Sequence, residues 1–144
     1  MYEYNSVIRK IVDGDTVDVD IDLGFGVWLK DQRIRINGLD TPECRTSDIE
    51  EKIFGLAAKN YVIQNLPVGS RQILKTVIDD DGNDVKGKFG RILGDFVIRD
   101  ETMLAEQMIA QGYGVAYTGQ NKKDIAEQHL KNRTRLVKAG IVQV

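Results

Sequence analysis

The sequence predicts a mainly β, α+β fold in which five short strands form a barrel and three helices accompany it. Segments in which apolar and polar residues alternate are typical of half-buried strands. Three such segments precede the first helical segment, and two follow it. Two further segments with helical spacing of apolar residues end the chain. The order is therefore three strands, a helix, two strands and two helices.

The first three strands are expected at residues 7–12, 16–22 and 27–36. The turn sequence DGD joins the first two, so they are predicted to form a hairpin. In the second segment, TVDVDID, three apolar residues alternate with three aspartates. This alternation indicates one face turned to the core and one turned outward.

A helix is expected after the third strand. Ser47 and Glu50 have the spacing of a capping box, with Ser47 as the N-cap, and Pro67 follows the last helical position. The apolar positions recur at helical intervals: Ile53, Ala57 and Tyr61, with Phe54 and Ala58 on the flank.

Two further strands and two helices are expected after this helix. Strands are expected at residues 71–78 and 91–98, and the segment TMLAEQMIAQG is a short helix that ends at Gly112. A longer helix follows, with Asn121 as its N-cap and Gly140 after its last turn. Five short strands with a helix inserted after the third predict a small Greek-key barrel of the OB-fold type.

The composition of the chain limits the number of domains and the classes of partner that can be expected. The chain of 144 residues, 42% hydrophobic and 29% charged, is expected to form one globular domain over residues 1–144. Its net charge of −2 means that any contact with nucleic acid must depend on a local positive site. The single cysteine excludes an intramolecular disulfide and fits a reducing compartment. No signal peptide or membrane-spanning run is recognised, so we expect no membrane partner and a cytoplasmic or unassigned location.

Two acidic turns contain candidate catalytic residues. Asp13 and Asp15 flank a glycine, which most often means only a hairpin turn, but two carboxylates could leave this turn close together. Carboxylate oxygens are preferred ligands of hard cations such as Ca²⁺. In the second turn, Pro42 restricts the backbone between Asp40 and Glu43. One of these carboxylates could bind a metal while the other acts as a base on water.

Basic residues are further candidates for the functional site. Arg35 lies on the strand face opposite its apolar neighbours, where it could form a salt bridge or bind two phosphate oxygens. The segment KGKFGRIL places Lys86, Lys88 and Arg91 around Phe89, which is either an ordinary exposed loop or a contact for phosphate and base. A cation site, a base and two guanidiniums together are what metal-assisted phosphodiester hydrolysis requires.

Three short motifs in the sequence resemble those of a known protein family. The motifs DGDT, R-x-x-G-L-D-T-P-E and K-F-G-R, in that order, are similar to the three motifs of the staphylococcal nuclease (thermonuclease) family. The likeness runs from about residue 8 to residue 136. It implies an OB-fold barrel and a Ca²⁺-dependent nuclease that cuts DNA and RNA with little sequence preference and leaves 3′-phosphate and 5′-hydroxyl ends.

The resemblance also implies roles for the acidic motifs. Asp15 and Asp40 would bind Ca²⁺ through their carboxylates, and Thr41 would bind it through its backbone carbonyl. Glu43 would contact the attacking water, either as a general base or as an electrostatic and ordering residue.

The basic and aromatic positions would hold the substrate, which we expect to be single-stranded or locally opened. Arg35 and Arg91 match the two catalytic arginines of the family, and Lys88 and Tyr117 match positions near the terminal phosphate and base. Phe89 stands where the secreted enzyme has tyrosine, so a hydroxyl contact is missing. His129, the only histidine, is expected to be structural or solvated, with no role at the metal.

An alternative from another functional class stays open. An OB-fold of this kind can lose catalysis and serve as a binding module for nucleic acid or for a protein partner. Loss of a catalytic carboxylate or arginine would indicate that outcome. All five of these residues are present here: Asp15, Arg35, Asp40, Glu43 and Arg91. The sequence leaves the oligomeric state undetermined.

Overall fold

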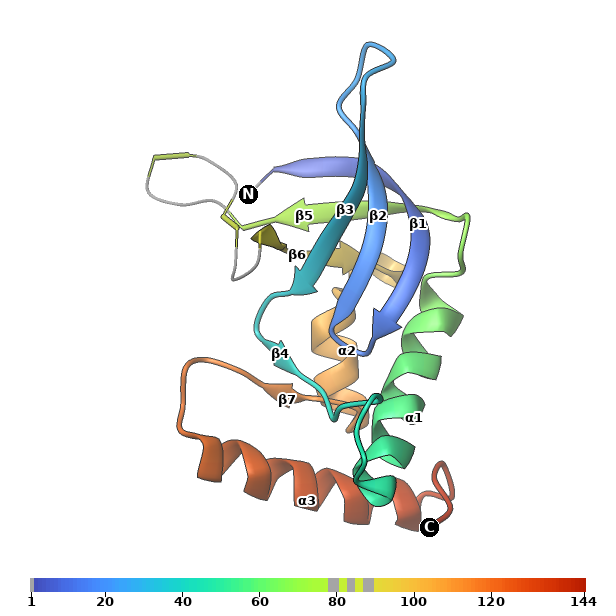
Figure 1. Cartoon of the computed structure of the whole chain (residues 1–144), viewed down its shortest axis with the longest axis vertical. Coiled ribbons are helices and arrows are strands. Elements are labelled where there is room, and N and C mark those ends of the chain that lie inside the picture. The colour runs from blue at the N-terminus through green and yellow to red at the C-terminus, as the bar shows by residue number, and fades with distance from the viewer. Residues whose placement is uncertain (1, 78–80, 83–84, 87–89) are drawn as a thin grey trace.

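The computed structural model describes residues 2–77, 81–82, 85–86 and 90–144 (Figure 1). In chain order its strands and helices are β1 (Glu3–Asp13), β2 (Thr16–Asp22), β3 (Trp28–Ile36), β4 (Leu39–Asp40), α1 (Ile49–Asn65), β5 (Arg71–Thr76), β6 (Ile92–Val97), the 3₁₀ turn η2 (Arg99–Glu101), α2 (Leu104–Gln111), β7 (Val115–Ala116) and α3 (Lys122–Lys138).

Five of these strands close into a barrel in the order β1-β2-β3-β6-β5. Neighbouring strands are antiparallel except for β3 and β6, which run parallel. With three helices outside the barrel, this architecture confirms the expected α+β fold of OB type. The first strand begins at Glu3, earlier than expected, because its N-terminal half pairs with β5 and closes the barrel.

The apolar residues of the alternating strands fill the barrel. Val17, Val19 and Ile21 of β2 are 0–3% exposed, and Ile34 and Ile36 of β3 are similarly buried. The expected apolar face of the second strand is therefore correct. Burial of such side chains stabilises the fold by roughly 1.5–3 kcal/mol each.

The opposite face of β2 is less exposed than its three aspartates suggest. Asp20 is 2% exposed and accepts hydrogen bonds from the backbone N–H of Asp31 at 2.9 Å and from the Arg9 guanidinium. These donors, the Asp31 N–H first, hold the pKa of this carboxylate below its usual value. A buried carboxylate is tolerated here because hydrogen bonds and an ion pair replace its water.

The start of α1 differs from the expected capping box. The N-cap is Asp48, not Ser47, and its carboxylate accepts from the N–H of Glu51 at 3.1 Å. The N–H of Asp48 in turn donates to the hydroxyl of Thr46, which fixes the residue in the capping position. An aspartate one position further along satisfies the same free N–H groups that the serine was expected to satisfy.

The buried face of α1 is also displaced by one position. Its buried residues are Phe54, Gly55, Ala58 and Val62, whereas Ile53, Ala57 and Tyr61 are only partly buried. Periodicity finds a stripe of apolar residues but does not tell which edge of the stripe meets the core. The Gly112 and Asn121 caps of α2 and α3 are confirmed.

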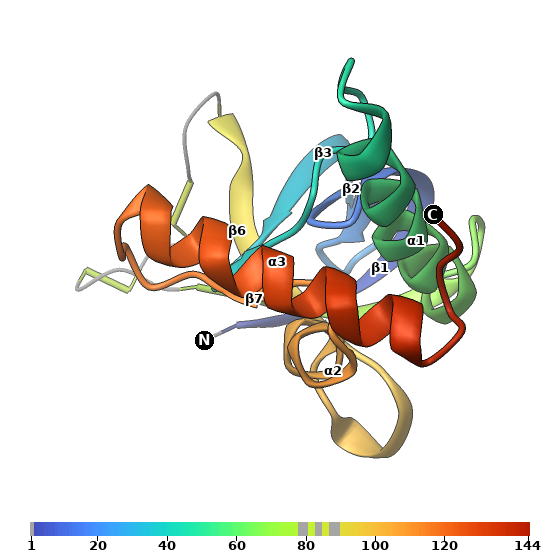
Figure 2. The same cartoon turned by 90° about the horizontal axis from the view of Figure 1, so that it is seen from below.

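The short ribbon β4–β7 was not predicted, because two-residue strands have no periodicity to detect. Asp40 of β4 pairs with Val115 of β7. Helix α3 lies alongside β7, on the side of the ribbon away from the barrel (Figures 1 and 2). The ribbon therefore joins the last helix to the segment that contains Asp40. Among the residues described, no helix is long and apolar enough to cross a membrane.

Candidate functional site

The two acidic turns meet at one end of the barrel. The backbone N–H of Thr41 lies 3.4 Å from Oδ2 of Asp15, although the residues are 26 positions apart. The hydroxyl of Thr16 donates to Oδ1 of the same carboxylate at 3.0 Å. Asp15 is 8% exposed and Thr41 is 5% exposed, so both positions are held firmly by their surroundings. The structure thus brings Asp15 and Thr41 together, two of the three predicted metal positions.

Three glycines allow the segment from Leu39 to Glu43 to pack closely. A β-carbon at Gly55 of α1 would lie 2.3 Å from the carbonyl oxygen of Glu43. A β-carbon at Gly14 would lie 2.9 Å from the hydroxyl oxygen of Thr41, and one at Gly114 would lie 2.4 Å from Cδ1 of Leu39. The absence of these side chains lets α1, the turn between β1 and β2, and the residue before β7 approach this segment closely.

Arg35 faces the same carboxylate. Its Nη1 donates to the carbonyl of Ile36 at 2.7 Å, and its Nη2 lies 3.5 Å from Oδ2 of Asp15. The side chain is 18% exposed. One edge of the guanidinium is therefore held by the barrel end, and the planar fork can present further N–H groups to an anion.

Repulsion between carboxylates marks this end of the barrel. Burial, followed by the charges of Asp15, Glu51 and Asp40, raises the pKa of Glu43 above its usual value. Burial and the neighbouring Asp15 raise the pKa of Asp13 to about 7. The N–H of Asp15 also donates to Oδ1 of Asp13 at 3.1 Å. Clustered carboxylates of this kind favour a bound cation or a bound proton.

The donor set fits a hard cation better than a soft one. Asp15 and Asp40 offer carboxylate oxygens, and Thr41 offers a backbone carbonyl, all of which suit Ca²⁺. Within the described part of the chain, no three His, Cys, Asp or Glu side chains converge to hold a metal by themselves. A cation here would therefore need the carbonyl and several water molecules to complete its six to eight ligands.

A cavity of about 710 Å³ opens beside these residues. Asp40, Thr41 and Glu43 line it, together with Tyr117 and residues of α3. Tyr117 is 46% exposed, and its backbone N–H donates to the carbonyl of Gly38, which fixes the residue next to the site. The aromatic ring is thus available to a ligand in this cavity.

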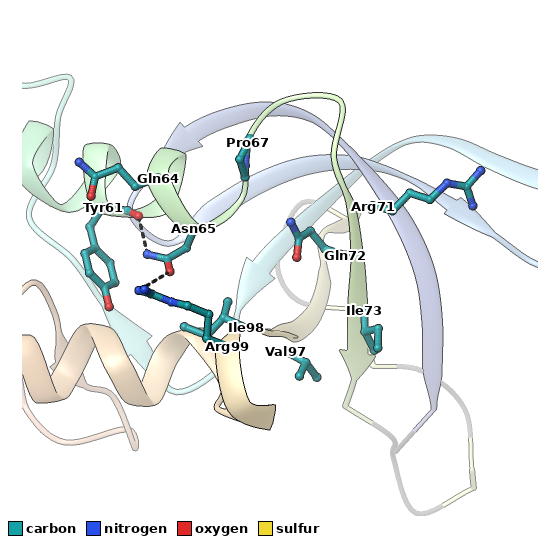
Figure 3. A pocket seen from close by; sticks show the side chains of 10 residues that line it. All are labelled: Tyr61, Gln64, Asn65, Pro67, Arg71, Gln72, Ile73, Val97, Ile98 and Arg99. Carbon is teal, nitrogen blue, oxygen red and sulfur yellow. Dashed lines mark hydrogen bonds between the residues drawn. The ribbon is translucent and has the colours of Figure 1, made fainter.

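A second cavity, of about 730 Å³, lies on another part of the barrel (Figure 3). It lies between the end of α1 and strands β5 and β6, and Arg71 and Arg99 line it together with three carboxamide side chains. Arg99 contacts the side chain of Asn65 at 3.5 Å. None of the predicted site residues is among those lining this cavity, so the carboxylate-lined cavity is the candidate site.

His129 lines the candidate site, where no role was expected for it. Its Nε2 lies 2.7 Å from Oδ2 of Asp40, and its side chain is 15% exposed. A signal was present in the sequence: His129 and Asn132 share a helix face with Ile125 and Leu136. Polar residues on the buried face of a helix require a partner inside the fold.

The third motif is only partly described. Leu93 of β6 pairs with Arg35 of β3. Arg91, two residues earlier, immediately precedes β6, the strand next to the one that contains Arg35. Lys88 and Phe89 lie outside the described residues, and their predicted contacts remain predictions.

Comparisons with known proteins identify the family of the chain. A family model described as "Staphylococcal nuclease homologue" matches residues 33–141. The chain is 30% identical over 95 residues to a thermonuclease of Staphylococcus intermedius, and the match covers 66% of this chain and 49% of that protein. It is 25% identical over 120 residues to Endonuclease YhcR of Bacillus subtilis (strain 168), covering 80% of this chain and 9% of that protein. The chain therefore spans half or less of the length of these relatives.

Proposed function

Because this chain belongs to the staphylococcal nuclease family, we propose that it is a Ca²⁺-dependent nuclease that hydrolyses phosphodiester bonds of DNA and RNA. The contact of Asp15 with both Thr41 and Arg35 is the observation that supports this proposal most. Thr41 also lines the cavity of about 710 Å³, whereas Asp15 and Arg35 are not among its lining residues. A carboxylate beside a guanidinium supports the proposal, because the first could bind a cation and the second a phosphodiester. Residues 1–144 would form one nuclease domain.

Each residue of the site has a role in this proposal. Asp15 and Asp40 would hold the cation through their carboxylates, and Thr41 would hold it through its backbone carbonyl. When bound, the cation supplies positive charge to the phosphoryl oxygens and lowers the cost of the charge that develops on them. Arg35 binds the same phosphoryl group from the barrel side, because its fork can donate to two oxygens.

Glu43 acts on the attacking water. Its carboxylate accepts a proton from the water as the water oxygen forms a bond to phosphorus. Burial is the largest cause of the raised pKa of Glu43, and it makes this carboxylate a better proton acceptor than an exposed one. The bond from phosphorus to the 5′ oxygen then breaks, and Arg91 stabilises the departing oxygen until that oxygen takes a proton from water. Glu43 returns its proton to the solvent. The products carry a 3′-phosphate and a 5′-hydroxyl.

The substrate is proposed to be a single strand or a locally opened duplex. Tyr117, which lines the cavity, can stack on a base, and such stacking contributes about 1–3 kcal/mol. Lys88 is proposed to contact the terminal phosphate, and Phe89 is proposed to stack without the hydroxyl contact of a tyrosine.

Digestion of matched substrates tests the proposal. Plasmid DNA, single-stranded DNA and RNA are incubated with Ca²⁺, with Mg²⁺ and with EGTA, and the ends of the products are identified. We expect cleavage of all three with Ca²⁺, little with Mg²⁺ because its octahedral demands are stricter, and none with EGTA. Glu43→Gln serves as the catalytic control. Binding of single-stranded DNA without cleavage under any condition would support the alternative, a catalytically inactive binding module.

A further inference from the structure

Helix α3 holds the β4–β7 ribbon by two side-chain hydrogen bonds from neighbouring turns. His129 contacts Asp40 of β4, with Nε2 at 2.7 Å from Oδ2. Asn132, three residues later, donates from Nδ2 to the carbonyl of Gly114 at 3.0 Å. Gly114 immediately precedes Val115, which is the pairing partner of Asp40. One face of α3 therefore contacts both strands of the ribbon.

The position of α3 is itself fixed. Ile125 and Leu136 are 9% and 2% exposed, and they anchor the helix on either side of His129. Arg133 lies over the ring of Phe54 in α1 at 5.3 Å. Because the helix is attached at both ends and to α1, the imidazole is presented to Asp40 from a rigid element rather than from a loop.

The direction of the hydrogen bond follows from its chemistry. An ionised carboxylate only accepts, so Nε2–H of His129 donates to Oδ2 of Asp40. This bond restricts rotation of the Asp40 carboxylate. It engages Oδ2 and not Oδ1. Groups that orient a metal ligand in this way commonly change metal affinity by 10–100-fold when removed.

We propose that His129 is a positioning residue for Asp40, which it holds in the orientation that binds the cation, and that α3 is thereby coupled to cation binding. The proposal rests on the proposed function, because it takes Asp40 to be a ligand of Ca²⁺. It adds a residue outside the three motifs and a helix that the motifs do not include.

Calcium affinity measured without substrate tests the proposal. Ca²⁺ is titrated into wild type, His129→Ala, His129→Gln and Gln128→Ala, and the backbone amide shifts of residues 40, 41, 43 and 114–117 are followed by NMR. We expect His129→Ala to weaken Ca²⁺ binding by about 10–100-fold. His129→Gln should recover part of the affinity, because its amide N–H can replace Nε2–H. Gln128, exposed on the same helix, is the matched control and should have no effect.

A double-mutant comparison separates positioning from general stability. In an Asp40→Ala background, His129→Ala should weaken Ca²⁺ binding no further, because its effect passes through Asp40. Equal losses in both backgrounds would assign His129 a structural role and overturn the proposal. Tighter Ca²⁺ binding by His129→Ala would also overturn it, because the imidazole would then compete with the cation.

The proposed coupling of α3 to Ca²⁺ binding is tested by amide hydrogen exchange. Amide hydrogen exchange of residues 125–136 should slow on addition of Ca²⁺ in wild type and in Gln128→Ala, but much less in His129→Ala. If wild type binds Ca²⁺ and cleaves DNA while His129→Ala is unchanged in affinity and exchange, only the positioning role fails. If wild type binds no Ca²⁺, the proposed cation dependence fails, and the positioning role fails with it.

Discussion

The α-carbon of Gly55 lies directly against the carbonyl group of Glu43, so that a β-carbon at position 55 would lie 2.3 Å from the carbonyl oxygen. Real β-carbons do not approach an oxygen so closely, and the backbone of Glu43 cannot yield as a flexible side chain would. Helix α1 therefore reaches the candidate site only because position 55 has no side chain.

We expect Gly55→Ala to damage both stability and activity. Alanine in a helix normally gains about 1 kcal/mol over glycine. Here the overpacking costs roughly 1–3 kcal/mol, and displacement of Glu43 by about 1 Å can lower kcat on the order of 10²-fold. Chemical unfolding and single-stranded DNA cleavage measure the two effects. Asn60→Ala, on the exposed side of the same helix, is the control and should be neutral or slightly stabilising.

Glu43→Gln and Asp40→Asn should fail in different ways. Loss of a base lowers the rate by about 10² to 10⁴ while the cation is still bound. Loss of a ligand charge should instead raise the Ca²⁺ concentration needed for half-maximal activity. Activity measured across a Ca²⁺ titration distinguishes them, and identical Ca²⁺ dependence of the two variants would contradict the assigned roles.

Arg35→Lys should lower kcat by about 10² to 10³, although the charge is kept. Lysine cannot donate to the Ile36 carbonyl and to a phosphate with a planar fork. Arg91→Lys is expected to be impaired for the same reason. Arg33→Lys is the matched control, because Arg33 is exposed on the same strand and pairs with Asp18 at 2.8 Å. An exposed pair of this kind contributes about 0.2–1 kcal/mol, so kcat should stay near wild type.

Asp95 should make the protein less stable as the pH rises from about 4 to 6. Burial raises the pKa of Asp95 to about 6, although its carboxylate accepts from the N–H groups of Phe96 and Ala105. A folded-state pKa above the unfolded value means that the native state binds the extra proton in this interval, so stability falls with rising pH. The loss is complete above pH 6 and is on the order of 1–3 kcal/mol.

Asp95→Asn provides the comparison. The amide oxygen can still accept from both N–H groups, including that of Ala105 in the first turn of α2, and it carries no charge at any pH. The unfolding free energy of the variant relative to wild type should therefore increase between pH 4 and 6 and then level off. A constant difference between the two proteins across this interval would contradict the raised pKa.

The barrel was accessible from sequence because its strands alternate. Val17, Val19 and Ile21 recur with the period of a strand and are buried as that period requires. The capping position of α1 was wrong by one residue, since Ser47 and Asp48 both satisfy the chemistry of a cap and only the path of the preceding loop selects Asp48. The β4–β7 ribbon left no pattern to read, because each of its strands has two residues.

The candidate site, like the fold, was predictable from the sequence only in part. The types and spacing of Asp15, Asp40, Glu43 and Arg35 were visible in the sequence, and so was the chemistry that such groups can perform together. Their meeting was an inference from a family resemblance, because the separation of Asp15 from Thr41 along the chain gives no distance in space. Closure of the barrel sets that distance at 3.4 Å.

By itself, then, the sequence determined the strands, the helices and the residue types at the candidate site, since these depend on local periodicity and on side-chain chemistry. Tertiary structure alone decided that Gly55 lies against Glu43 and that His129 contacts Asp40 across 89 positions of chain. Contacts of this kind depend on how elements pack against one another. Helical periodicity places His129 on one face of α3, but only the packing of that helix against the β4–β7 ribbon gives the imidazole its partner.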